Sequence, residues 1–81
     1  MHELAFTEGI IKLISQEAEK QGFTKCYSIT LSVGDMSGIV PECIEGFFPI
    51  AAEGTIAEGA RLYFNRCEES AGCYIDSIEV E

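Results

Sequence analysis

Residues 26–33 read CYSITLSV, and this stretch decides the fold. Its side chains alternate between two sets, an apolar set of Tyr27, Ile29, Leu31 and Val33 and a second set of Cys26, Ser28, Thr30 and Ser32. Successive side chains of a β-strand point to opposite faces, so the pattern predicts a strand with one core face and one polar face. A sheet built around this strand is therefore covered by helices on one side only.

A helix is predicted before this strand, from about Thr7 to Gln21. Apolar residues recur there at spacings of three and four, and they form the stripe Phe6, Ile10, Leu13, Ile14 and Ala18. Thr7 can cap the start of the helix, and Gly22 can end it in a left-handed conformation.

A second helix is predicted after the loop Gly34–Gly38. It begins at Pro41, where the missing N–H has no cost, and it ends at Gly54. Its apolar stripe consists of Val40, Ile44, Phe47, Phe48 and Ala51. Pro49 lies inside this pattern and is expected to kink the helix.

Two further strands are predicted, from Arg61 to Arg66 and from Tyr74 to Glu81, with residues 67–72 joining them as a hairpin loop. In the last strand the predicted inward side chains are Tyr74, Ile78 and Val80. The order is helix, strand, helix, strand, strand. The fold class is therefore α+β, with two helices packed on one face of a three-stranded sheet in a single domain covering residues 1–81.

The charge balance excludes several classes of partner. Five Lys and Arg residues stand against fourteen Asp and Glu residues, which gives a formal net charge of −9. No basic face can be assembled for nucleic acid, and an anionic membrane surface is disfavoured for the same reason. The first twenty residues have no basic segment followed by an apolar core, so they do not form a signal peptide. We therefore expect a cytoplasmic protein with reduced cysteines.

The first three residues carry a potential metal chelate. The Met1 amine, the His2 amide and the His2 imidazole can close fused rings around one ion, and the Glu3 amide or carboxylate can supply the fourth position. A deprotonated amide ligand favours Ni(II) or Cu(II) in a square plane over tetrahedral zinc. From the residues alone, a solvated His2 remains the more common alternative.

Three other residues, Asp35, Cys67 and Cys73, are candidates for a functional role. Asp35 lies in a loop after the central strand, where functional groups gather, but it can equally form a turn. Cys67 and Cys73 do not have the spacing of a zinc ribbon. They could form a disulfide across the predicted hairpin, contribute half of a metal site shared between two chains, or be incidental thiols. The sequence contains no nucleophile–base pair and no nucleotide-binding glycine motif, so we expect no enzyme.

Four segments in this order resemble the HypA/HybF family, which comprises nickel metallochaperones for maturation of [NiFe]-hydrogenase and, in some organisms, urease. They are residues 1–4 (MHEL), 34–42 (GDMSGIVPE), 54–60 (GTIAEGA) and 75–81 (IDSIEVE). The resemblance implies a Ni(II) site made by the terminal amine, the His2 amide and imidazole and the Glu3 backbone, with Asp35 nearby. It also implies a HypB-type GTPase as partner.

The resemblance also has one departure. Family members carry a zinc domain with two C-x2-C pairs between the last two strands, whereas only residues 65–72 fill that interval here, so no zinc is expected. The chain is then a nickel-binding domain alone. The alternative hypothesis is an acidic interaction module that docks on a maturation GTPase or on itself and has no functional metal site.

Overall fold

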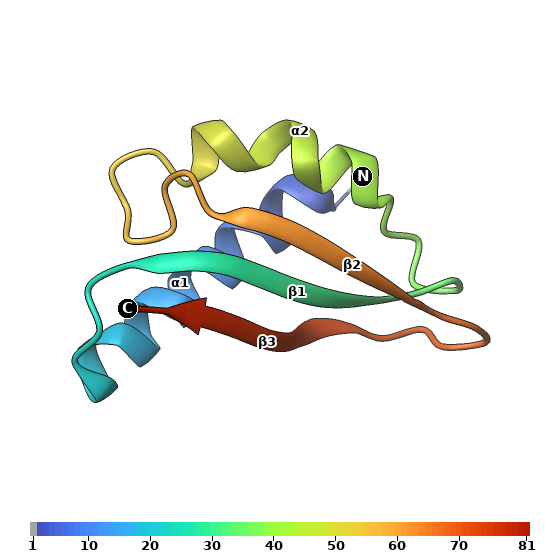
Figure 1. The fold of residues 1–81 in the computed structure, drawn as a ribbon. Helices are drawn as coiled ribbons and strands as arrows, with labels where there is room; N and C mark the ends of the chain where they lie inside the picture. The colour runs from blue at the N-terminus through green and yellow to red at the C-terminus, as the bar shows by residue number, and fades with distance from the viewer. Residues whose placement is uncertain (1) are drawn as a thin grey trace.

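The computed structural model describes residues 2–81. Its elements are α1 (Glu3–Gln21), β1 (Cys26–Gly34), α2 (Pro41–Ala51), β2 (Arg61–Cys67) and β3 (Cys73–Val80), as Figure 1 shows. β1 is the central strand of a sheet with the order β2-β1-β3. It runs parallel to β2 and antiparallel to β3. The predicted α+β architecture, with both helices on one face of a three-stranded sheet, is confirmed.

The predicted hairpin between the last two strands is wrong. β2 and β3 do not pair with each other, because both pair with β1 and lie on its opposite sides. Residues 68–72 therefore cross the end of β1 instead of turning back beside it (Figure 1). Local turn composition suggested the hairpin, but it carries no information about which strand is the neighbour.

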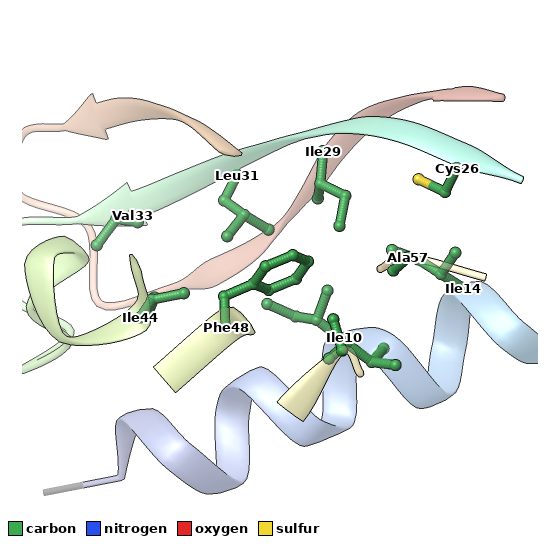
Figure 2. Packing of buried hydrophobic residues seen from close by; sticks show 11 residues of the cluster. Ile10, Ile14, Cys26, Ile29, Leu31, Val33, Ile44, Phe48 and Ala57 are labelled. Carbon is green, nitrogen blue, oxygen red and sulfur yellow. The ribbon is translucent and has the colours of Figure 1, made fainter. Parts of the chain in front are cut away.

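The core lies between the sheet and the two helices (Figure 2). Its buried members are Ile10, Ile11, Ile14, Cys26, Ile29, Leu31, Val33, Ile44, Phe48, Ala52 and Ala57. The central strand supplies the middle of this cluster because it has neighbours on both edges and both helices over one face. The apolar side of the predicted strand thus becomes the core from Ile29 to Val33.

The first residues of β1 depart from the predicted alternation. Cys26 is fully buried in the core, whereas Tyr27 is 50% exposed. The pairing of β1 with β3 shifts register between Cys26 and Ser28, so Tyr27 is an extra residue in a β-bulge. The bulge reverses the phase of the strand, and burial raises the pKa of the Cys26 thiol. Cys26 is consequently a core residue and not part of the polar face.

β3 has a second bulge that also corrects the prediction. The pairing shifts between Thr30 and Leu31 of β1, which leaves Asp76 of β3 as the extra residue. As a result Ile75, which the sequence predicted as outward, packs against the core. Tyr74, which the sequence predicted as inward, is exposed. Ile78 faces inward as predicted.

α1 begins four residues earlier than predicted, at Glu3. Thr7 does not cap it, because the Thr7 hydroxyl is buried inside the helix and donates to the Glu3 carbonyl at 2.6 Å. The helix does end at Gly22, whose φ of 82° is left-handed. Its buried stripe includes Ile11 in place of the predicted Leu13, which is 59% exposed.

α2 begins at Pro41 as predicted and continues through Pro49 to Ala51, where it ends three residues before the predicted Gly54. Only part of the predicted apolar stripe is buried. Ile44 and Phe48 lie in the core, but Val40 and Phe47 are 45% and 40% exposed.

The end of β1 is closed by the crossing segment 68–72. The N–H groups of Gly34, Asp35 and Met36 donate to the carbonyls of Gly72, Cys67 and Ser70 at 2.8 to 2.9 Å. The two backbones approach so closely that a Cβ built on Gly34 would lie 2.1 Å from the Ser70 carbonyl oxygen. A glycine is therefore required at position 34 by packing and not by its φ angle.

The uncovered face of the sheet is tied together by a carboxylate. The Asp76 side chain accepts hydrogen bonds from the Ser32 hydroxyl of β1 and from the Asn65 amide of β2, which donates at 3.0 Å. These hydrogen bonds hold the pKa of Asp76 below its ordinary value, with Ser32 as the larger cause. The bulge at Asp76 thus links both edge strands across the central one.

Candidate metal centre at the amino terminus

The first turn of α1 presents main-chain donors at its open end. His2 is the residue that precedes the helix, with φ −112° and ψ 11°, and its side chain makes no capping hydrogen bond. Its carbonyl accepts from the Phe6 N–H at 2.9 Å, which starts the helical pattern. The first amide N–H groups of any helix have no carbonyl one turn earlier to bond. The His2 amide and its exposed imidazole therefore lie outside the helical hydrogen-bond pattern.

Glu3 is almost fully buried, at 4% exposure, although it is the first residue of the helix. Its Oε2 accepts the N–H of Val40 at 3.0 Å, so the carboxylate joins the start of α1 to the residue before α2. The pKa of Glu3 is lowered from 4.5 to about 2 by the hydrogen bonds that its carboxylate accepts, those from the N–H groups of Val40 and of Glu3 itself included. The carboxylate is thus ionised and accepts main-chain N–H groups from two segments of the chain.

The loop between β1 and α2 reaches the amino-terminal turn through Val40. The sequence singled out Asp35 of this loop, but its carboxylate instead receives the Arg66 Nε at 3.1 Å, at the crossing end of the sheet. The Val40 contact was missed because a main-chain donor leaves no mark on residue type. Its partner Glu3 lies 37 positions away, which no local pattern reveals.

Cys67 and Cys73 lie on opposite edges of the sheet. Cys67 pairs with Gly34 on one side of β1, and Cys73 pairs with Val33 on the other. Strands two positions apart are about 10 Å from each other, beyond the reach of a disulfide. Both thiols are free, and burial raises the pKa of Cys73. The geometry thus disfavours the disulfide suggested by the hairpin prediction.

Side chains alone do not form a metal site in the described part of the chain. Among residues 2–81, no group of three or more His, Cys, Asp and Glu side chains is arranged to hold an ion. A metal ion here would need main-chain nitrogen ligands, as the predicted chelate does. Met1, whose amine is the first predicted ligand, lies outside the described residues.

The sequence model of one protein family, described as hydrogenase/urease nickel incorporation, metallochaperone, hypA, matches residues 1–80. The chain belongs to the HypA family. The predicted resemblance is thereby confirmed, and the family description is that of a metallochaperone, in agreement with the expectation that the chain is not an enzyme.

Curated relatives support the same assignment. Hydrogenase maturation factor HypA of Caldanaerobacter subterraneus subsp. tengcongensis is 41% identical over 64 residues, which are 79% of this chain and 56% of that protein. Hydrogenase maturation factor HypA 2 of Bradyrhizobium diazoefficiens is 38% identical over 81 residues, which are 100% of this chain and 72% of that protein. The HypA-family chain thus spans between about half and three quarters of the length of these relatives.

The fold is also similar to a solved HypA structure. The solution structure of the Ni metallochaperone HypA from Helicobacter pylori matches with a TM-score of 0.74 over 100% of this chain and 87% of that chain. The sequence identity of this pair is 13%, so the match speaks for the fold alone. No helix within residues 2–81 is both long and apolar enough to cross a lipid bilayer.

Proposed function

We propose that this HypA-family chain is a nickel-binding domain that serves maturation of [NiFe]-hydrogenase, or of urease, in the cytoplasm. Ni(II) is its cargo. The proposed ligands are the Met1 amine, the His2 amide and imidazole and the Glu3 amide. The observation that carries the proposal is the position of His2, because its exposed imidazole and its amide lie together at the start of α1, outside the helical hydrogen bonds.

The start of a helix suits this ligand set for an electrostatic reason. Aligned peptide dipoles place a partial positive charge at a helix amino terminus, which disfavours a bare cation but favours anionic groups. A deprotonated His2 amide and a deprotonated Glu3 amide are anionic, so the dipole assists the loss of their protons. The resulting site is exposed, as a carrier that must release its ion requires.

The partner in this proposal is a HypB-type maturation GTPase, with delivery to the hydrogenase maturation machinery. The family description and the named relatives support hydrogenase maturation in general. The proposal also includes the absence of a zinc domain, since residues 68–72 alone connect β2 to β3. Asp35 pairs with Arg66, so an assisting role would require this ion pair to open.

The test is a Ni(II) titration of untagged protein at neutral pH, followed by calorimetry and absorption. We expect one equivalent with the yellow d–d band of square-planar nickel. His2→Ala and a variant with two glycines added before Met1 should both abolish this band, since the first removes a ligand and the second moves the amine too far from His2 for the chelate to close. Mass spectrometry of the intact protein confirms that the Met1 amine is free. Equal nickel binding by all three proteins would contradict the proposed ligands.

The alternative is an acidic interaction module without a functional metal site, favoured by the net charge of −9. It predicts that binding to a maturation GTPase is indifferent to His2→Ala and is weakened by neutralising Glu42 or Glu58. A pull-down with purified GTPase, with and without Ni(II), separates the two functions.

The absence of a zinc domain has its own test. Zinc content measured by elemental analysis should be below one tenth of an equivalent, on the order expected for adventitious metal.

A further inference from the structure

α2 carries two apolar faces, and only one of them is buried. Ile44 and Phe48 lie in the core. A second stripe repeats at spacings of three and four, and it consists of Val40, Cys43, Phe47 and Ile50. All four residues are exposed, and Ile50 reaches 81%. Residues with this spacing share one side of a helix, so α2 presents a continuous apolar ridge to solvent.

This outer ridge contains a hole at Gly46. Positions i, i+3, i+4 and i+7 surround one recess on a helix surface, and here they are Cys43, Gly46, Phe47 and Ile50. A Cβ built on Gly46 would meet no atom within 4 Å, so the backbone at the floor of the recess is open. Glycine is the poorest helix former apart from proline, and no packing contact in the described chain requires it at this position. The recess is shaped to receive a side chain from outside.

The charge around the ridge has one sign. Residues 26–60 contain five acidic residues and no Lys, Arg or His. Three of the five, Glu42, Glu45 and Glu53, lie on α2 or directly after it, and all are exposed. Glu42 and Glu53 lie beside Gly46 in the helical period and border the ridge, whereas Glu45 lines a hollow with Phe48 and Leu62 on another side of the helix. An apolar ridge bordered by carboxylates is complementary to an apolar ridge flanked by Lys and Arg. A second copy of this chain would bring four such carboxylates together, so self-association at this face is disfavoured.

The groove between α1 and β3 is the competing surface. It has a volume of about 690 Å³ and is lined by Phe6, Gly9, Leu13 and Tyr74, among others. Its borders carry both signs of charge, since Lys12 lines it and Lys20 and Glu17 line its continuation. It therefore selects no partner by charge, whereas the α2 ridge does.

We propose that the outer face of α2 is a docking surface for an amphipathic basic helix of a partner protein. An apolar side chain of that helix fills the recess at Gly46, and its flanking Lys or Arg residues pair with Glu42 and Glu53. The 3–4 spacing of the ridge matches a partner that is itself helical, since helices interlock through this repeat. The proposal goes beyond the nickel site, because the ridge lies on α2, whereas His2 precedes α1 (the two helices are labelled in Figure 1).

The test uses a fluorescein-labelled synthetic helical peptide with leucines at heptad a and d positions and lysines elsewhere. Binding is followed by fluorescence anisotropy and mapped by amide chemical shifts. We expect shifts along Val40, Cys43, Gly46, Phe47 and Ile50, and an affinity that falls as salt rises. Ile50→Ser should weaken binding by about tenfold or more, as loss of a central apolar contact does.

The decisive variant fills the recess. Gly46→Leu replaces a poor helix former by a good one at an open position and should weaken binding by about tenfold, because the partner's side chain is excluded. The matched control is Gly9→Leu, which adds the same side chain at the other open helical glycine, in the groove of α1. This control should leave the affinity within about twofold. Circular dichroism confirms that both variants are folded.

Four outcomes would overturn the proposal. The first is no binding of the peptide, and the second is equal binding of a lysine peptide without leucines, which means charge alone. The third is a shift map on Leu13 and Tyr74 with loss of binding in Gly9→Leu, which assigns docking to the α1 groove. The fourth is a concentration-dependent dimer in sedimentation that Ile50→Ser abolishes, which makes a second copy the occupant. All four readings are taken without nickel, so they do not depend on the proposed nickel function.

Discussion

The two regions that flank the loop between β1 and α2 differ in how their main-chain groups are used. At the crossing end of the sheet, the N–H groups of Gly34, Asp35 and Met36 all have protein acceptors. At the start of α1, the His2 amide precedes the helical pattern and its imidazole is exposed. The comparison shows that main-chain hydrogen bonds close the crossing end of the sheet, whereas the first turn of α1 leaves His2 exposed to solvent.

The largest expected effect on stability comes from Gly34→Ala. The added methyl would lie 2.1 Å from the Ser70 carbonyl oxygen, so the crossing segment must move. We expect a loss of about 3 kcal/mol, or roughly 15 °C in Tm for a domain of this size. Thermal unfolding by circular dichroism measures it. Gly9→Ala is the control, because its site is open and the change should slightly raise Tm. A wild-type Tm for Gly34→Ala would show that the closed end is not rigid.

His2→Ala should lower nickel affinity and leave stability almost unchanged, whereas the main effect of Gly34→Ala is on stability. The side chain is exposed and makes no capping hydrogen bond, so stability should change by less than about 0.5 kcal/mol. Nickel affinity should fall on the order of 100-fold, or about 2.7 kcal/mol, because the imidazole ligand is lost. Calorimetry and thermal unfolding on the same samples check both numbers. A large loss of Tm in this variant would make His2 a structural residue and would break the comparison.

Glu3 joins the start of α1 to the residue before α2, so its variants should affect both stability and nickel affinity. Glu3→Ala removes the acceptor of the Val40 N–H and is expected to lower Tm and to speed hydrogen exchange at Val40. Glu3→Gln keeps an acceptor and should restore much of that protection. If the carboxylate only positions the turn, Glu3→Gln should also keep nickel affinity within a few-fold. A loss of nickel binding in Glu3→Gln equal to that in His2→Ala would instead make the carboxylate a ligand.

The smallest expected effect concerns the Asp76 link across the sheet. Hydrogen bonds from Ser32 and then from Asn65 lower the pKa of Asp76 below 3.8 in the folded chain. A depressed carboxyl pKa contributes stability that is present above the unfolded value and is lost as pH falls below it. Asp76→Asn should therefore flatten the loss of the urea midpoint below about pH 4.

Ser32→Ala provides the matched control for this carboxylate, because it removes the donor with the larger effect on the Asp76 pKa. Ser32→Ala should make the urea midpoint fall less steeply with decreasing pH, to a smaller extent than Asp76→Asn does, and it should leave nickel binding unchanged. If the urea midpoint of Asp76→Asn falls with decreasing pH as steeply as that of the wild type, other carboxylates dominate the loss of stability in acid.

Much of the fold could be predicted from local pattern. The alternation from Ile29 to Val33, the Pro41 start of α2 and the Gly22 end of α1 all hold, because each depends on neighbours within one turn or one strand. The errors at Cys26 and Tyr74 come from bulges, which depend on the register of a partner strand. The false hairpin has the same origin, since the choice of neighbour is made by the whole sheet.

The candidate site divides in the same way. His2 could be selected as a candidate from the sequence because the hypothesised chelate uses adjacent residues only. Glu3 could be selected too, but its burial and its bond to Val40 could not, because the two residues meet only after α2 docks beside α1. The sequence did not reveal that Asp35 pairs with Arg66, because Arg66 lies on β2, 31 positions later in the chain.

The sequence by itself determined the α+β class and the acidic surface, and it raised the hypothesis of a metal chelate at residues 1–3, because these follow from periodicity, composition and adjacent atoms. The tertiary structure alone decided that β1 is central, that residues 68–72 close over Gly34, and that α2 keeps an apolar ridge around Gly46 exposed. The physical reason is that burial is a property of the assembled core. A stripe such as Val40 to Ile50 reads as core until packing shows which face of the helix is already satisfied.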